Sequence, residues 1–158
     1  MATDLEHPYL HTVWADDIRH EVGNKVSLMG IYAQDIVVPA LPTVLHRLLC
    51  HSTLMVPIEQ RPKRLIYRLL MDDTVLVEQT TELNDESLPT PPGRPVTRNS
   101  FMMVLMMSPL ELPAGTCTLC SQMDIDGRVL QGSKLWVTVA DTPQLGEPNV
   151  ATMPQPPA

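Results

Sequence analysis

A chain of 158 residues with 44% hydrophobic and 18% charged residues is long enough for one globular domain and too apolar to be wholly disordered. Its formal net charge of −7 argues against nucleic acid and anionic membranes as partners, and three cysteines argue against a disulfide framework. The sequence shows neither a leader pattern nor an apolar run near the roughly 18 residues of a membrane helix, so we expect a cytoplasmic protein.

Proline and glycine divide the chain into short segments. Sixteen prolines make long helices difficult to place, because proline fixes φ and removes a hydrogen-bond donor. We expect an N-terminal arm over residues 1–9, one β-domain over residues 10–141 and a disordered proline-rich tail over residues 142–158.

The first third of the chain contains several apolar segments of strand length. The segment 43–49, with valine and leucine at helical spacing, is expected to form one or two helical turns. The charged stretch 16–25 reads as a connection. Strands are expected at residues 11–15, 25–33, 35–38 and 50–56.

The clearest alternation of apolar and polar residues runs from Arg64 to Met71. A period of two places successive side chains on opposite faces of a sheet. Asp72 and Asp73 then indicate a turn, and residues 74–81 are expected to return with Val75 and Val77 facing inward. The stretch 88–95 has four prolines and is expected to form an exposed loop.

The last third predicts three more strands. Residues 100–107 are apolar on both faces, which indicates either a central strand covered on both sides or a contact surface. Residues 116–125 and 128–139 flank Asp126-Gly127, the strongest hairpin turn in the chain. The whole pattern predicts an all-β, mostly antiparallel β-sandwich of about eight strands with one or two short helical turns.

Two stretches carry a resemblance to a known group of proteins. Residues 16–32 read DDIRHEVGNKVSLMGIY, and residues 113–127 run from a PAGT turn to a DIDG turn. Together they resemble an uncharacterised bacterial and phage-associated "domain of unknown function" family with a D-x-I-R-x-E…G-K-x-S-L-x-G-x-Y opening. Here Asn24 separates Gly23 from Lys25. The resemblance covers roughly residues 10–140 and implies an all-β fold in a phage or prophage setting. It implies no catalytic residues.

Catalytic and cofactor signatures are not evident in the sequence. Cys117 and Cys120 form a C-x-x-C pair, but on a strand residues i and i+3 face opposite ways, so Cys117 is expected in the core and Cys120 outside. The five histidines show no metal-ligand spacing, and no nucleophile or phosphate-loop motif appears. We therefore expect a protein without enzymatic activity and without a cofactor.

Acidic pairs near turns are the one pattern that points to a metal. Calcium takes several oxygen ligands from convergent loops, whereas aspartate is also a common turn residue in its own right. A calcium- or ligand-binding β-sandwich is therefore kept as an alternative, with these candidate ligands: Asp16, Asp17, Asp72, Asp73, Asp124 and Asp126.

The favoured hypothesis is a structural or protein-interaction module, phage- or prophage-encoded, in the host cytoplasm or the virion. Its partner would be another protein or a second copy of the chain, bound through the side chains of Met102, Val104 and Met106. A phage inhibitor of a host enzyme or defence protein is the further alternative.

Overall fold

The computed structural model describes residues 7–23, 25–84, 93 and 97–140, and this part of the chain contains twelve strands and no helix. The strands are β1 (Tyr9–Ala15), β2 (Asp17–Glu21), β3 (Lys25–Met29), β4 (Asp35–Val38), β5 (Thr43–Leu45), β6 (Leu48–Pro57), β7 (Arg64–Met71), β8 (Thr74–Glu82), β9 (Arg98–Met107), β10 (Leu110–Leu112), β11 (Cys117–Ile125) and β12 (Arg128–Val139). The all-β prediction is confirmed, with more strands than the eight expected.

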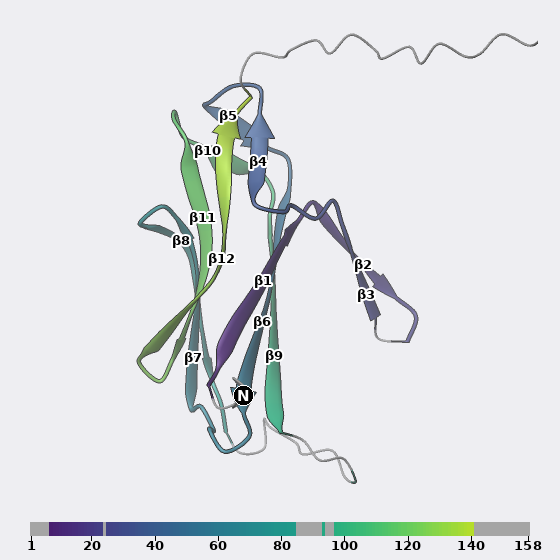
Figure 1. Cartoon of the computed structure of the whole chain (residues 1–158), viewed down its shortest axis with the longest axis vertical. Helices are drawn as coiled ribbons and strands as arrows, with labels where there is room; N and C mark the ends of the chain where they lie inside the picture. Colours follow the sequence, from purple (N-terminus) through teal and green to yellow (C-terminus); the bar gives the residue numbers. More distant parts are fainter. Residues whose placement is uncertain (1–6, 24, 85–92, 94–96, 141–158) are drawn as a thin grey trace, which may run out of the picture.

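The strands form two main sheets and two small ones (Figure 1). One main sheet has the order β1-β6-β9, and the other has the order β4-β12-β11-β7-β8. The small sheets are β2-β3 and β10-β5. All pairs are antiparallel except β12 with β4. The hairpin of β2 and β3 stands apart from both main sheets in Figure 1.

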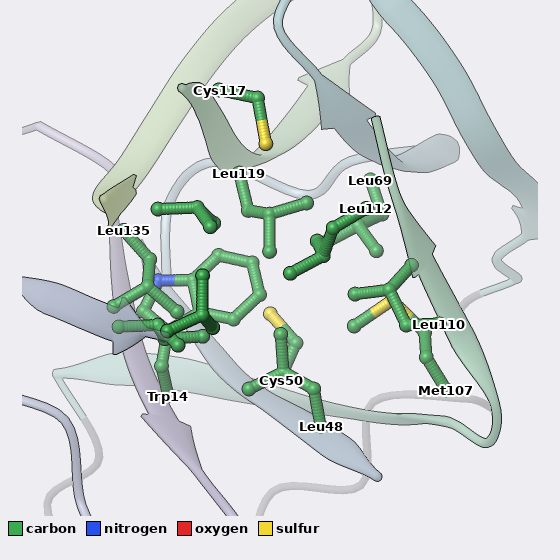
Figure 2. Close-up of a cluster of buried hydrophobic side chains, with 13 residues drawn as sticks. Trp14, Leu48, Cys50, Leu69, Met107, Leu110, Leu112, Cys117, Leu119 and Leu135 are labelled. Atoms are coloured by element: carbon green, nitrogen blue, oxygen red, sulfur yellow. The ribbon is translucent and has the colours of Figure 1, made fainter. Parts of the chain in front are cut away.

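Both main sheets contribute to the core, which divides into two clusters of buried side chains. The first, shown in Figure 2, joins Trp14 and Cys50 of one sheet to Leu119 and Leu135 of the other. The second joins Leu54 and Val56 to Tyr67, Met123 and Ile125. These residues alternate along β6, β7 and β11, so the period of two in the sequence is the cause of the packing.

The predicted helical turns over residues 43–49 are wrong. Thr43–Leu45 forms β5, paired with β10, and β6 already begins at Leu48. Leu48 and Leu49 are both fully buried, one on each face of β6, because each face of this strand is covered near its start. Burial on both faces gives consecutive apolar residues, which imitate helical spacing in the sequence.

The two hairpin turns are confirmed in position. Asp72 and Asp126 both have positive φ, 51° and 49°, and each follows directly on a strand that pairs with the next one. Val77 faces the first core cluster as expected, but Val75 is exposed. The register between β7 and β8 shifts between Leu69 and Leu70, and such a bulge reverses which side chains face inward.

Parts of the predicted organisation lie outside the described residues. These are the tail over residues 142–158, most of the arm over residues 1–9 and, apart from Gly93, the proline loop over residues 88–95. In the part that is described, β1 begins at Tyr9 and β12 ends at Val139. No segment there forms a helix able to cross a membrane.

Candidate interaction face

The outer face of the sheet β1-β6-β9 points away from both core clusters and has an unusual composition. Its pairing registers place residues from the three strands in rows, with Val13, His51 and Val104 in one row and His11, Thr53 and Met102 in the next. The face comprises Tyr9, His11, Val13, Ala15, Leu49, His51, Thr53, Met55, Pro57, Arg98, Ser100, Met102, Val104 and Met106. Among these residues Arg98, beside Tyr9 at one end, is the only charged one, and none is Asp or Glu although the chain carries a net charge of −7.

β9 supplies the most apolar and most exposed part of this outer face. Met102, Val104 and Met106 are 57%, 44% and 41% exposed, while Phe101, Met103, Leu105 and Met107 point to the core. The double apolar pattern of residues 100–107 is therefore not that of a central strand. β9 lies at the sheet edge, with one face in the core and the other open to solvent.

One end of the outer face is covered by the start of the β2–β3 hairpin. Ala15 and Leu49 are fully buried, yet they belong to neither core cluster and pair with each other on the outer side of β1 and β6. β2 begins two residues after Ala15 and lies against β6. The exposed side chains of β9 therefore lie next to a part of the same face that the hairpin already buries.

The residues that carry the opening motif form the base of this hairpin. The φ of Gly30 is +66°, and a Cβ there would overlap the Asp16 carboxylate. Tyr32 donates its hydroxyl hydrogen to Asp16, and burial with this hydrogen bond raises the pKa of Tyr32 to about 12. An ion pair of 2.7 Å joins Asp17 to Arg47. The predicted charged connection is therefore a β-hairpin, held where it leaves the sheet.

A chain of buried hydroxyl groups links the two main sheets. Thr12 Oγ1 lies 2.6 Å from Ser121 Oγ and 3.1 Å from Ser52 Oγ, and Ser52 Oγ lies 3.1 Å from the hydroxyl of Tyr67. Cys50 Sγ completes it at 3.2 Å from the same Tyr67 hydroxyl. Each of these buried polar groups has a hydrogen-bond partner within the network. Such a network is typical of a structural link between two sheets.

The nucleophilic groups of this network are not activated. Burial raises the pKa of the Cys50 thiol to about 11, although hydrogen bonds with Tyr67 and Ser52 act to lower it. Burial also raises the pKa of Tyr67 well above its usual range. The thiol is consequently protonated at neutral pH, whereas a reactive cysteine is a thiolate. In the part of the chain that the structure describes, these hydroxyls bond to one another and to Cys50, and no histidine or carboxylate there is bonded to them as a base.

Cys117 and Cys120 lie on opposite faces of β11. Cys117 belongs to the first core cluster, and Cys120 lines a polar hollow on the outer face of the five-stranded sheet together with Thr118, Gln122 and Lys134. Burial raises the pKa of both thiols. Cys117 therefore faces the core and Cys120 the opposite side of the sheet, as expected, but Cys120 is only 6% exposed.

The six aspartates of the calcium alternative are spread over separate places. Asp72 accepts hydrogen bonds from the backbone and hydroxyl of Thr118, and Asp126 accepts from the backbone of Lys63 and Arg64. Asp124 accepts from the Gly127 amide within its own turn. Asp73 stands beside Asp72 in the β7–β8 turn, and Asp16 and Asp17 hold the β2–β3 hairpin. Across the described ranges, no three His, Cys, Asp or Glu side chains are close enough to hold a metal ion.

Two features of the candidate site were not found from the sequence. The first is the width of the outer face, because Tyr9, His11 and His51 come to lie beside β9 only through strand pairing. The second is the hairpin that covers one end of it. Alternation within the charged stretch 16–25 was the available signal, since Ile18, His20 and Val22 alternate with charged residues.

Comparisons with protein-family models, curated proteins and solved structures found no match for this chain.

Proposed function

We propose that this protein is a non-enzymatic interaction module that binds a protein through the outer face of its three-stranded sheet. The observation that carries the proposal is a sheet face without acidic residues, charged only at Arg98 at one end and half-exposed at Met102, Val104 and Met106, on a chain with net charge −7. Large apolar side chains exposed in one continuous row are typical of protein contact surfaces. The same surface is unsuited to nucleic acid or anionic lipid, which need basic residues.

The proposal includes a β-sandwich domain formed by the two main sheets and a phage or prophage setting, in the host cytoplasm or the virion. The setting is inferred from the resemblance of residues 16–32 to phage-associated proteins. The absence of enzymatic activity is supported by the protonated Cys50 thiol and by buried hydroxyl groups bonded to one another and to that thiol. The calcium alternative has less support, because its aspartates are engaged in separate turns.

A photo-crosslinking amino acid at position 104 tests this proposal in the cells that express the chain. We expect adducts from position 104, because a bound protein would cover that side chain. The matched control is position 129, a valine 50% exposed on β12 of the other main sheet. No adduct at position 104, or equal adducts at both positions, would contradict the proposed contact face.

A further inference from the structure

β9 has one edge that no described strand occupies. It pairs with β6 over ten consecutive residues without a register shift, and no other strand of the described chain pairs with it. Within the described chain, the backbone N–H and C=O groups of residues 99–107 that point away from β6 therefore have no partner strand.

The other edges of the fold are protected against such pairing. β8 carries Glu78 and Glu82 and is distorted by the bulge opposite β7. β4 has only four residues. β1 is flanked by β12, since the Trp14 indole donates to the carbonyl of Ser133 and the Ser133 hydroxyl donates to the carbonyl of Thr12. β2 and β3 are five residues each; β2 carries charges of both signs and β3 begins with a lysine. Short length, charge, bulges and cover are the usual devices that block strand addition.

Beyond its first residue, β9 lacks all of these devices. Its single charge is Arg98 at the first position, where the guanidinium lies 5.2 Å from the centre of the Tyr9 ring. Residues 99–107 carry no charge and no proline, and the strand is among the longest in the fold. A long, regular, apolar edge is a template for another strand unless it has a partner.

We propose that β9 pairs antiparallel with β9 of a second copy, across a twofold axis that places Val104 opposite Val104, to form one six-stranded sheet. This pairing rests on the proposed function, and it identifies the bound protein as a second copy of the chain. Opposite residues of an antiparallel pair lie on the same face, so Met102, Val104 and Met106 of both copies form one apolar strip. Across a twofold axis, the same strand edge contacts itself in both copies, so no second type of surface is needed.

Charge also favours a second copy at this place. Two chains of net charge −7 repel each other over most of their surfaces. β9 and the rest of the outer face contain no acidic residue, so two copies meet there with the least repulsion.

Sedimentation equilibrium and hydrogen exchange on the full chain test the pairing together. We expect a mass twice 17.6 kDa at high concentration and the monomer mass on dilution. Those amides of β9 that point away from β6 are expected to exchange at least about tenfold more slowly in the concentrated sample. Amides on the free edge of β8 serve as the control, and their exchange is expected to be the same in both samples.

Two outcomes would overturn this inference. A monomer at every concentration would exclude pairing with a second copy. A photo-adduct from position 104 to a different protein would in that case still support the proposed function. A dimer in which the outward amides of β9 exchange as fast as in the monomer would exclude strand pairing, because contact between side chains leaves those amides without partners.

Discussion

Replacement of Gly132 by alanine is expected to lower the free energy of unfolding by about 2–5 kcal/mol, the largest stability effect we predict for a single methyl group. A Cβ at Gly132 would overlap Thr12 Oγ1 and Ser121 Oγ and lie 2.9 Å from Thr12 Cβ. These hydroxyls are bonded to each other at 2.6 Å in the buried network between the sheets. Room for the methyl group therefore requires a broken hydrogen bond or a displaced strand. Urea denaturation followed by tryptophan fluorescence measures the change.

Gly127→Ala is the matched control for this substitution. Its φ is +95° and a Cβ there would meet nothing within 4 Å, so only backbone strain of about 1–2 kcal/mol is expected. The combination of Gly132→Ala with Thr12→Ala should cost less than the sum of the two single changes, because the nearest clashing oxygen is removed. Equal losses for Gly132→Ala and Gly127→Ala would refute the role given to the network.

Substitution of both Met102 and Met106 by glutamate is expected to weaken association by more than about 100-fold while leaving the folded monomer intact. Each thioether buried in a contact contributes on the order of 25 cal/mol per Å² of apolar area, and each glutamate adds a charge to a copy that is already acidic. Both side chains are exposed in the monomer, so its melting temperature should change little. Sedimentation and the adducts from position 104 measure the association, and thermal melting measures the fold.

Val37→Glu with Val129→Glu provides the matched control. These valines are 62% and 50% exposed on β4 and β12, and the added charge is the same. Association should survive in this variant. Unfolding of the Met102→Glu, Met106→Glu variant would instead identify the outer side of β9 as part of the core. If the Met102→Glu, Met106→Glu variant associates as strongly as the unsubstituted chain, these side chains are not part of the contact.

The sequence predicts strands well where one face is buried and the other is solvated. Arg64–Met71, Asp35–Val38 and Arg128–Val139 have the predicted bounds because their side chains alternate and turn residues limit them. The sequence-based prediction is wrong where both faces of a strand are buried or where a bulge interrupts the alternation. Leu48 and Leu49 are buried on opposite faces, and the bulge opposite Leu69 and Leu70 leaves Val75 exposed.

The candidate face was only partly predictable for a related reason. Met102, Val104 and Met106 stand out in the sequence because they break the alternation of a half-exposed strand. The position of β9 at a sheet edge depends on the strand order, and local sequence does not encode which strand lacks a neighbour. The uncharged rows formed with His51 and Val13 likewise depend on long-range register.

The oxidation rates of individual methionines test most directly whether a partner covers the outer face. Met102 and Met29 are 57% and 42% exposed in the isolated chain, the first on β9 and the second at the base of the β2–β3 hairpin. Peroxide oxidation, read by mass spectrometry, can be compared between the dilute purified chain and the chain in its cells. Because burial of a thioether slows its oxidation, we predict that the rate of Met102 relative to Met29 falls severalfold in the cells. An unchanged ratio would contradict a partner that covers the outer face of the sheet at β9.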